Sequence, residues 1–231
     1  MMQRPGYRSL RSARRVTQAA NTPAMNLHAI VPVKALDRAK SRLASALAPA
    51  ERRQLVREMF ERVLGALAAA PVTITWVVSP DAEVLALAAT RGARPLAEGP
   101  AELNAALEQA RSAARAAGAT ALIIVPADVP LIRPVDVAAM AGLLAAGADV
   151  VLAPDAAGLG TNGLALRADA ALPFRFGDDS AALHLRAAAA RGLLTRLYHA
   201  PGLALDVDDP AALARYRAAL AGIALGEHGQ D

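Results

Sequence analysis

The sequence predicts an α/β protein whose mainly parallel, mixed sheet is flanked by helices on both faces. Short apolar runs alternate along the chain with longer stretches in which apolar residues recur every three or four positions. The runs LHAIVPV and ALIIV are apolar at nearly every position, so both faces of these strands are expected to be buried. Strands of this kind, separated by helices, form a sheet between two helical layers.

Each predicted element follows from one of these two patterns. Strands are predicted at the apolar runs, which cover residues 27–33, 72–78, 121–125 and 150–153, with 164–166 as an additional candidate. The first helix, residues 50–69, carries Leu55, Met59, Val63 and Leu67 at intervals of four. Further helices are predicted at residues 81–91, 101–117, 134–146, 180–191 and 210–221.

Composition narrows the classes of function. The 231 residues suit one sizeable domain or two small ones, and 55% hydrophobic with 20% charged residues is typical of a globular chain. The absence of cysteine excludes disulfides, thiolate metal sites and a cysteine nucleophile, and it fits the reducing cytoplasm. Only 3% of the residues are aromatic, which argues against stacking on single-stranded nucleic acid.

The net charge of +4 belongs to the N-terminus. Residues 1–24 hold five of the 25 basic residues and no acidic one, which leaves 20 basic and 21 acidic residues in the rest of the chain. We therefore predict a basic, disordered extension over 1–24 and a single domain over 25–231, with neither a nucleic acid nor a membrane as partner. Met25 directly precedes the first strand, so the extension is either a disordered arm or sequence upstream of a misplaced start codon, with a transit peptide as the alternative.

Ligands of parallel sheets bind at the carboxyl ends of the strands, which makes the loops there the place to look for chemistry. The loop after the first strand contains Lys34 and Lys40, the only lysines in a chain whose other 23 basic residues are arginine. A compact ammonium makes a point contact that a guanidinium does not reproduce. With Arg42 nearby, this loop is predicted to bind a polyphosphate, and a solvated basic loop is the alternative.

Two acidic segments predict a metal site. Asp128 follows the apolar strand 121–125 within VPADVP. The next predicted helix begins only at residue 134, so Asp128 is poorly placed to cap it. Asp206 and Asp208 alternate in LDVDDP, so an extended backbone directs both carboxylates to one side. Carboxylate oxygens beside phosphate suit Mg²⁺. Turn or capping aspartates are the alternative.

The remaining candidates are weaker. GLGTNG at residues 158–163 matches the dinucleotide pattern GxGxxG, but a strand rather than a helix is predicted after it, so we reject that function. Ser180 or Asp179 is predicted to cap a helix whose N-terminal amides could also bind an anion, and His184 is predicted to be structural. Asn104, near a helix start, is a candidate nucleotide ligand, with capping or packing as the alternative.

Five motifs in order resemble one family. PVKxxxxAKSRLA (32–44), PADVP (126–130), GTN (160–162), FGxxSxxxH (176–184) and LDVDDP (205–210) together resemble the guanylyltransferases of coenzyme F420 biosynthesis. This resemblance covers residues 27–221. It implies a Rossmann-like nucleotidyltransferase fold of the glycosyltransferase-A kind, and transfer of GMP from GTP to 2-phospho-L-lactate, phosphoenolpyruvate or 3-phospho-D-glycerate with release of pyrophosphate.

The resemblance also implies roles for individual residues. It implies that the catalytic residues are Lys34, Lys40 and Asp128. It implies that the GTP phosphates face Lys34, Lys40 and Arg42, and that the phosphorylated acid contacts Thr161, Gly177 and Ser180. It also implies that Mg²⁺ is held by Asp128, Asp206 and Asp208. It further implies hand-over of the product to the next transferase of the pathway.

One departure and two alternatives bear on this hypothesis. Asp178-Asp179 stands where the family often has Pro-Gly, which leaves the identity of the acid open. A sugar-phosphate nucleotidyltransferase or a glycosyltransferase of related fold is the first alternative. A non-catalytic nucleotide-binding module is the second.

Overall fold

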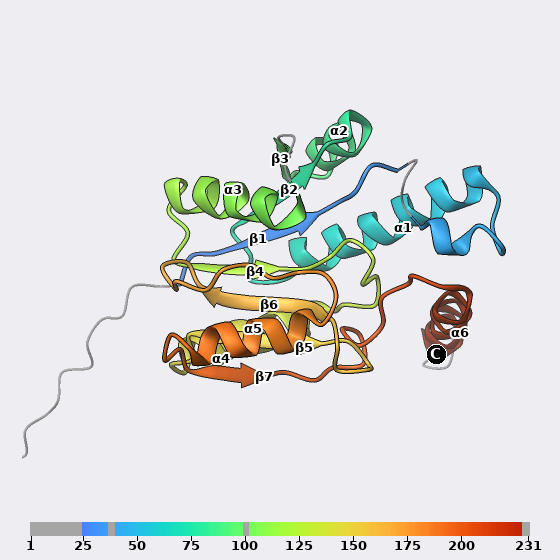
Figure 1. Ribbon diagram of the computed structural model, residues 1–231. Coiled ribbons are helices and arrows are strands. Elements are labelled where there is room, and N and C mark those ends of the chain that lie inside the picture. The colour runs from blue at the N-terminus through green and yellow to red at the C-terminus, as the bar shows by residue number, and fades with distance from the viewer. Residues whose placement is uncertain (1–24, 37–39, 99–101, 228–231) are drawn as a thin grey trace, which may run out of the picture.

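The computed structural model describes residues 25–36, 40–98 and 102–227 (Figure 1). The predicted extension over residues 1–24 lies outside these ranges. The described residues form a seven-stranded sheet of order β3-β2-β1-β4-β6-β5-β7. Its strands are β1 (Leu27–Pro32), β2 (Ile74–Ser79), β3 (Arg94–Ala97), β4 (Ala121–Ile124), β5 (Val150–Pro154), β6 (Thr161–Arg167) and β7 (Thr195–Leu197).

The sheet is mixed, because β6 runs antiparallel to β4 and β5 while the other strand pairs are parallel. The predicted α/β class and the mainly parallel sheet are thus confirmed. The helices in the described ranges are the short 3₁₀ turn η1 (Ser41–Leu43), α1 (Pro49–Ala68), α2 (Ala82–Thr90), α3 (Leu103–Ala116), α4 (Pro134–Ala145), α5 (Ser180–Ala189) and α6 (Pro210–Glu227).

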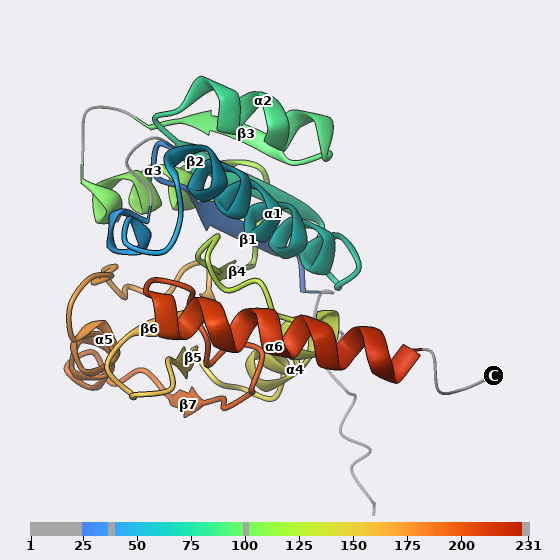
Figure 2. The same ribbon diagram turned by 90° about the vertical axis from the view of Figure 1, so that its right-hand side faces the viewer.

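Helices cover both faces of the sheet, as predicted (Figures 1 and 2). On β1, Ala29 and Val31 pack in the hydrophobic cluster that includes residues of α1, α2, α4 and α6. Ile30, on the opposite face, packs in the cluster formed with α3 and α5. Alternate residues of a strand point to opposite faces, which is why this apolar strand contributes to both clusters.

Two strands, β3 and β7, are additional to those predicted from the sequence. β3 and β7 are the edge strands of the sheet, and both are short. Most of their residues are exposed or half-buried, so their sequences, RPLA and TRL, contain no apolar run. An edge strand is recognised by pairing with its neighbour rather than by a local apolar pattern.

The strand order changes direction beside β1, which creates the position where ligands of such sheets bind. From β1 the chain continues to β2 and β3 on one side, and it then returns to β4 on the other. Because β6 is antiparallel and Leu164 pairs with Ile124, the first residue of β6, Thr161, lies at the carboxyl end of β4. The loops predicted to carry chemistry therefore share one edge of the sheet.

None of the helices within the described ranges combines the length and the apolar character needed to cross a bilayer.

Candidate active site at the carboxyl edge of the sheet

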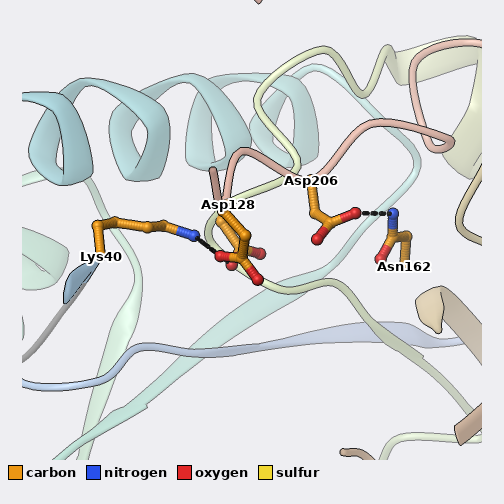
Figure 3. A network of polar contacts seen from close by, with 5 residues as sticks. Lys40, Asp128, Asn162 and Asp206 are labelled. Carbon is orange, nitrogen blue, oxygen red and sulfur yellow. Dashed lines mark hydrogen bonds and ion pairs between the residues drawn. The ribbon is translucent and has the colours of Figure 1, made fainter. Parts of the chain in front are cut away.

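Lys40 lies between two of the predicted carboxylates. Its Nζ is 2.7 Å from Oδ2 of Asp128 and also bonds Oδ1 of Asp208. Figure 3 shows the lysine side chain extended toward Asp128. Lys40 has a left-handed backbone, with φ of 59°, and its side chain is only 7% exposed. A buried cation is stable when it is paired, and here two carboxylates from distant parts of the chain pair it.

The charges of Asp128 and Asp208 contribute to shifts in the pKa values of Lys40 and Asp206. Burial lowers the pKa of the Lys40 ammonium, but the charges of Asp128 and Asp208 outweigh burial, so its pKa lies above the usual value. Burial raises the pKa of Asp206, and the neighbouring charges of Asp128 and Asp208 add to the rise, against a hydrogen bond from Asn162 that lowers it. The three aspartates are thus close enough to repel one another, and Lys40 neutralises part of that repulsion.

Backbone contacts bring the two acidic segments together. The backbone N–H of Val207, between Asp206 and Asp208, donates to the carbonyl oxygen of Asp128 over 3.0 Å. Gly202 passes so close to the loop after β4 that a Cβ there would stand 2.2 Å from the carbonyl oxygen of Leu131. Only glycine permits this approach, and it fixes the distance between the segments.

A buried carboxylate anchors the same two segments. Asp136, in the first turn of α4, is fully buried and accepts hydrogen bonds from the backbone N–H and the guanidinium of Arg133. It also accepts a 3.0 Å hydrogen bond from the hydroxyl of Tyr198, which precedes the acidic segment. The sequence did not point to Asp136 as part of the site, because its local pattern is that of an ordinary first-turn aspartate.

Asp206 does not bond Lys40, unlike Asp128 and Asp208. Its Oδ1 accepts a 3.3 Å hydrogen bond from the side-chain amide of Asn162, a buried residue of β6 (Figure 3). Asn162 was also missed as a site residue. The available signal was its position next to Thr161 in the GTN motif, at the start of a strand that was predicted only from residue 164.

The carboxylates fit a divalent metal in part. Asp128 and Asp208 already share one cation, the Lys40 ammonium, and their oxygens are ligands of the kind that Mg²⁺ prefers. The predicted set of three aspartates around one ion is not assembled, since Asp206 is bonded to Asn162. In the described ranges, no three His, Cys, Asp or Glu side chains are arranged to hold one metal ion. Asp128 and Asp208 therefore fit a metal, and Asp206 would have to turn toward it.

The residues expected to contact the acid gather around the N-terminus of α5. Thr161 and Ser180 are both buried, and Gly177 has φ of 129°, a conformation that favours glycine. His184, one helical turn after Ser180, lies with Nδ1 3.1 Å from Oγ1 of Thr161. The backbone N–H of Ala181 donates to the carbonyl oxygen of Leu159 over 3.0 Å, which ties α5 to the loop before β6.

Asn104 holds the loop before α5. Its Oδ1 accepts a 2.8 Å hydrogen bond from the backbone N–H of Phe176, and its Nδ2 donates to the carbonyl oxygen of the same residue over 3.0 Å. This is the packing alternative considered for Asn104 from the sequence. Its contact with a nucleotide stays a prediction.

Lys34 and Arg42 are not among the residues that the structure shows bonded to Asp128, Asp206 or Asp208. Both residues are exposed, and neither forms an ion pair with any residue that the structure describes. The two lysines therefore have different environments: Lys40 is buried between aspartates, whereas Lys34 projects into solvent at the same loop. This arrangement leaves Lys34 and Arg42 available to an anionic ligand.

Comparison with known proteins gives a consistent result. Residues 27–216 match the family described as "Guanylyl transferase CofC like". Over 194 residues, the chain is 46% identical to a phosphoenolpyruvate guanylyltransferase of Rubrobacter xylanophilus, covering 84% of this chain and 95% of the relative. It is 43% identical to a 2-phospho-L-lactate guanylyltransferase of Methanothermobacter thermautotrophicus, covering 80% of this chain and 81% of the relative.

A third relative and a solved structure extend the comparison. A 3-phospho-D-glycerate guanylyltransferase of Phenylobacterium zucineum is 43% identical, covering 79% of this chain and 85% of the relative. The crystal structure of a putative nucleotide-diphospho-sugar transferase from Desulfovibrio desulfuricans superposes with a TM-score of 0.67 at 18% identity, covering 80% of this chain and 83% of that one. The predicted nucleotidyltransferase fold is thereby confirmed.

Proposed function

The chain belongs to the family of CofC-like guanylyl transferases, and from this premise we propose that it transfers GMP from GTP to the phosphate of a three-carbon acid in coenzyme F420 biosynthesis. The acid is phosphoenolpyruvate, 2-phospho-L-lactate or 3-phospho-D-glycerate, the substrates that the names of its relatives state. The observation that carries this proposal is that Asp128 and Asp208 share one cation, the Lys40 ammonium, at the carboxyl edge of the sheet.

The reaction needs neither a protein nucleophile nor a general base. An oxygen of the acid's phosphate, anionic at neutral pH, attacks the α-phosphorus of GTP. The bond from the α-phosphorus to the oxygen bridging it to the β-phosphate breaks, and pyrophosphate leaves. Catalysis of such a step consists of positioning the reactants in line and neutralising the charge that develops.

The acidic segments suit a metal ion. We propose Mg²⁺, held by Asp128 and Asp208, with Asp206 as a third ligand once it leaves Asn162. When bound, the ion supplies charge neutralisation and a template for the phosphates. The Lys40 ammonium, which would be released from the carboxylates, then interacts with the GTP phosphates together with Lys34 and Arg42.

The acid is proposed to bind beside α5. Thr161, Gly177 and Ser180 surround the N-terminal end of this helix, whose dipole favours an anion. Asp178 and Asp179 are exposed at the same turn, and Asp179 has a left-handed backbone, with a carboxylate that accepts no capping hydrogen bond from the helix backbone. Two carboxylates at this place favour an acid that bears a hydroxyl group, which is 3-phospho-D-glycerate.

The direct test is a survey of products. The protein is incubated with Mg²⁺, GTP and each acid in turn, pyrophosphate is measured, and the nucleotide product is identified by mass spectrometry. ATP, CTP and UDP-glucose replace GTP in parallel reactions. We expect a GMP adduct of at least one acid, and pyrophosphate release with none of the three would overturn the proposal. Turnover of UDP-glucose would favour a sugar-nucleotide enzyme instead.

We also propose that the reaction takes place in the cytoplasm and that its product passes directly to the next enzyme. A chain without cysteine that uses GTP is expected to act in the cytoplasm. The product joins two phosphates in an anhydride, which is prone to hydrolysis. Hand-over to the next transferase of the pathway would protect it.

A further inference from the structure

We propose that His184 is a positioning residue that fixes the direction of the Thr161 hydroxyl, so that this hydroxyl donates its hydrogen bond to an anionic oxygen of the phosphorylated acid. This inference rests on the proposed function, which assigns Thr161 to the acid. His184 itself does not touch the reacting atoms. It acts through Thr161 by way of the hydrogen bonds of its ring.

The backbone of Arg175 determines the tautomer of His184. The N–H of Arg175 lies 2.9 Å from Nε2 of the imidazole. A backbone N–H can only donate, so Nε2 must accept and therefore carries no proton. The neutral ring then carries its proton on Nδ1.

The ring is neutral at the pH of the cytoplasm. His184 is 1% exposed. Burial, with a smaller contribution from the charge of Arg175, lowers its pKa to about 4, against a backbone hydrogen bond to Ser180 that raises it. With a single proton and with Nε2 occupied as an acceptor, the ring has no second tautomer that satisfies its partners.

This tautomer makes Thr161 a one-way donor. Nδ1 lies 3.1 Å from Oγ1 of Thr161, and since Nδ1 bears the proton it has no free lone pair, so the hydroxyl cannot donate to it; the hydroxyl and the backbone carbonyl oxygen of Ser180 are the acceptors for the Nδ1 proton. In the described part of the chain, Oγ1 of Thr161 has no second hydrogen-bond partner. Its own proton is therefore left for a ligand. A hydroxyl that only donates binds phosphate or carboxylate oxygens and discriminates against a ligand that presents a donor.

Packing holds the His184 ring in this orientation. The ring of Phe176 meets that of His184 edge to face, with 5.0 Å between centroids and 71° between planes. Asn104 in turn holds the backbone of Phe176 on both sides. The series Asn104, Phe176, His184 and Thr161 thus connects α3 to the first residue of β6. It runs through the loop that carries Gly177.

Two substitutions distinguish the roles of the two ring nitrogens of His184. In His184→Asn the side-chain amide stands near the position of Nδ1 and can still donate to Thr161. In His184→Gln the carboxamide stands near the position of Nε2, so it can bond Arg175 but not Thr161. We expect His184→Gln to raise the KM for the acid about tenfold, the effect of about one lost hydrogen bond, and His184→Asn to raise it less than about threefold. Neither substitution should change the KM for GTP.

A double-mutant cycle tests whether His184 acts through Thr161. Thr161→Val removes the hydroxyl and should raise the KM for the acid, whereas Thr161→Ser keeps the hydroxyl and should restore it. In the Thr161→Val background, His184→Gln should add nothing, since the contact it alters is already gone. Additive effects, or equal losses in the Asn and Gln variants, would overturn the inference. Melting temperatures of all variants verify that each one folds.

A spectroscopic measurement is independent of activity. Nitrogen-15 NMR of the imidazole in the full chain should show a neutral ring with the proton on Nδ1 at pH 7, and a proton on Nε2 would contradict the assignment. Absence of turnover with every acid would overturn the proposed function, and with it the acid as acceptor, while this spectrum would still decide the tautomer. The two failures are therefore distinguishable.

Discussion

Lys40→Met tests whether the Lys40 ammonium occupies the place of a metal ion between Asp128 and Asp208. Methionine keeps most of the length and apolar character of the side chain but removes the charge. The two carboxylates then face each other without a counter-ion, and they repel. We expect the variant to be destabilised in the presence of a chelator, and Mg²⁺ to restore stability by taking the place of the ammonium.

The size of the effect follows from the contacts that are lost. The Nζ of Lys40 makes a charge-assisted hydrogen bond of 2.7 Å to Asp128 and a second one to Asp208. Hydrogen bonds to charged groups contribute about 1.5–3 kcal/mol each in buried sites. Here the carboxylates are 30% and 47% exposed, and solvent screening reduces their contribution. We therefore expect a total loss of about 1.5 kcal/mol, which lowers the melting temperature by about 3–6 °C for a chain of this size.

The assay is thermal unfolding of wild type and variant with chelator and with increasing Mg²⁺. The increase in melting temperature on adding Mg²⁺ should be larger for Lys40→Met than for wild type, because wild-type Lys40 competes with the metal. Arg53→Met is the matched control: Arg53 pairs with Glu83 over the same 2.7 Å, but both side chains are about half exposed and lie outside the site. Equal Mg²⁺ effects in Lys40→Met and wild type would refute the idea of a shared cation position.

Three further predictions address other parts of the structure. Asp128→Asn should lower kcat about 100-fold or more, because it removes one of the two carboxylates that would hold a metal, and it should lower the melting temperature less than Lys40→Met does, because Asp208 still pairs with Lys40; near-normal turnover would remove Asp128 from the site. Gly202→Ala should destabilise the protein strongly, because its Cβ would stand 2.2 Å from the Leu131 carbonyl oxygen, whereas Gly65→Ala in α1, where a Cβ meets nothing within 4 Å, should be neutral or stabilising; equal melting temperatures would contradict the close packing of the two acidic segments. Between the ordinary His184 pKa of 6.5 and its folded value of about 4, the unfolded chain binds a proton that the folded chain excludes, so falling pH should lower the free energy of unfolding. The contribution of His184 to the change of the free energy of unfolding with pH should reach up to about 1.4 kcal/mol per pH unit. This contribution should be absent in His184→Gln, as measured by urea denaturation between these two pH values.

The sequence by itself determined the α/β class, most of the helices and the central strands. α1, α4 and β4 lie within one residue of their predicted bounds, because each is defined by its own apolar pattern and by the residues at its ends. It also singled out Asp128 and Lys40 as site residues. Asp128 follows a buried strand, and Lys40 is one of only two lysines in the chain.

Only the tertiary structure decided how the site residues pair. Nothing in the LDVDDP motif shows that Asp208 bonds Lys40 whereas Asp206 bonds Asn162, since both partners are distant in the sequence. The tautomer of His184 likewise depends on the backbone of Arg175 and on the start of β6. Local patterns indicate whether a segment becomes a helix or a strand, because the spacing of apolar residues decides which kind of element can bury them on one face. Contacts between distant side chains depend on strand register and on the close approach of loops, which are established only when the whole chain has packed.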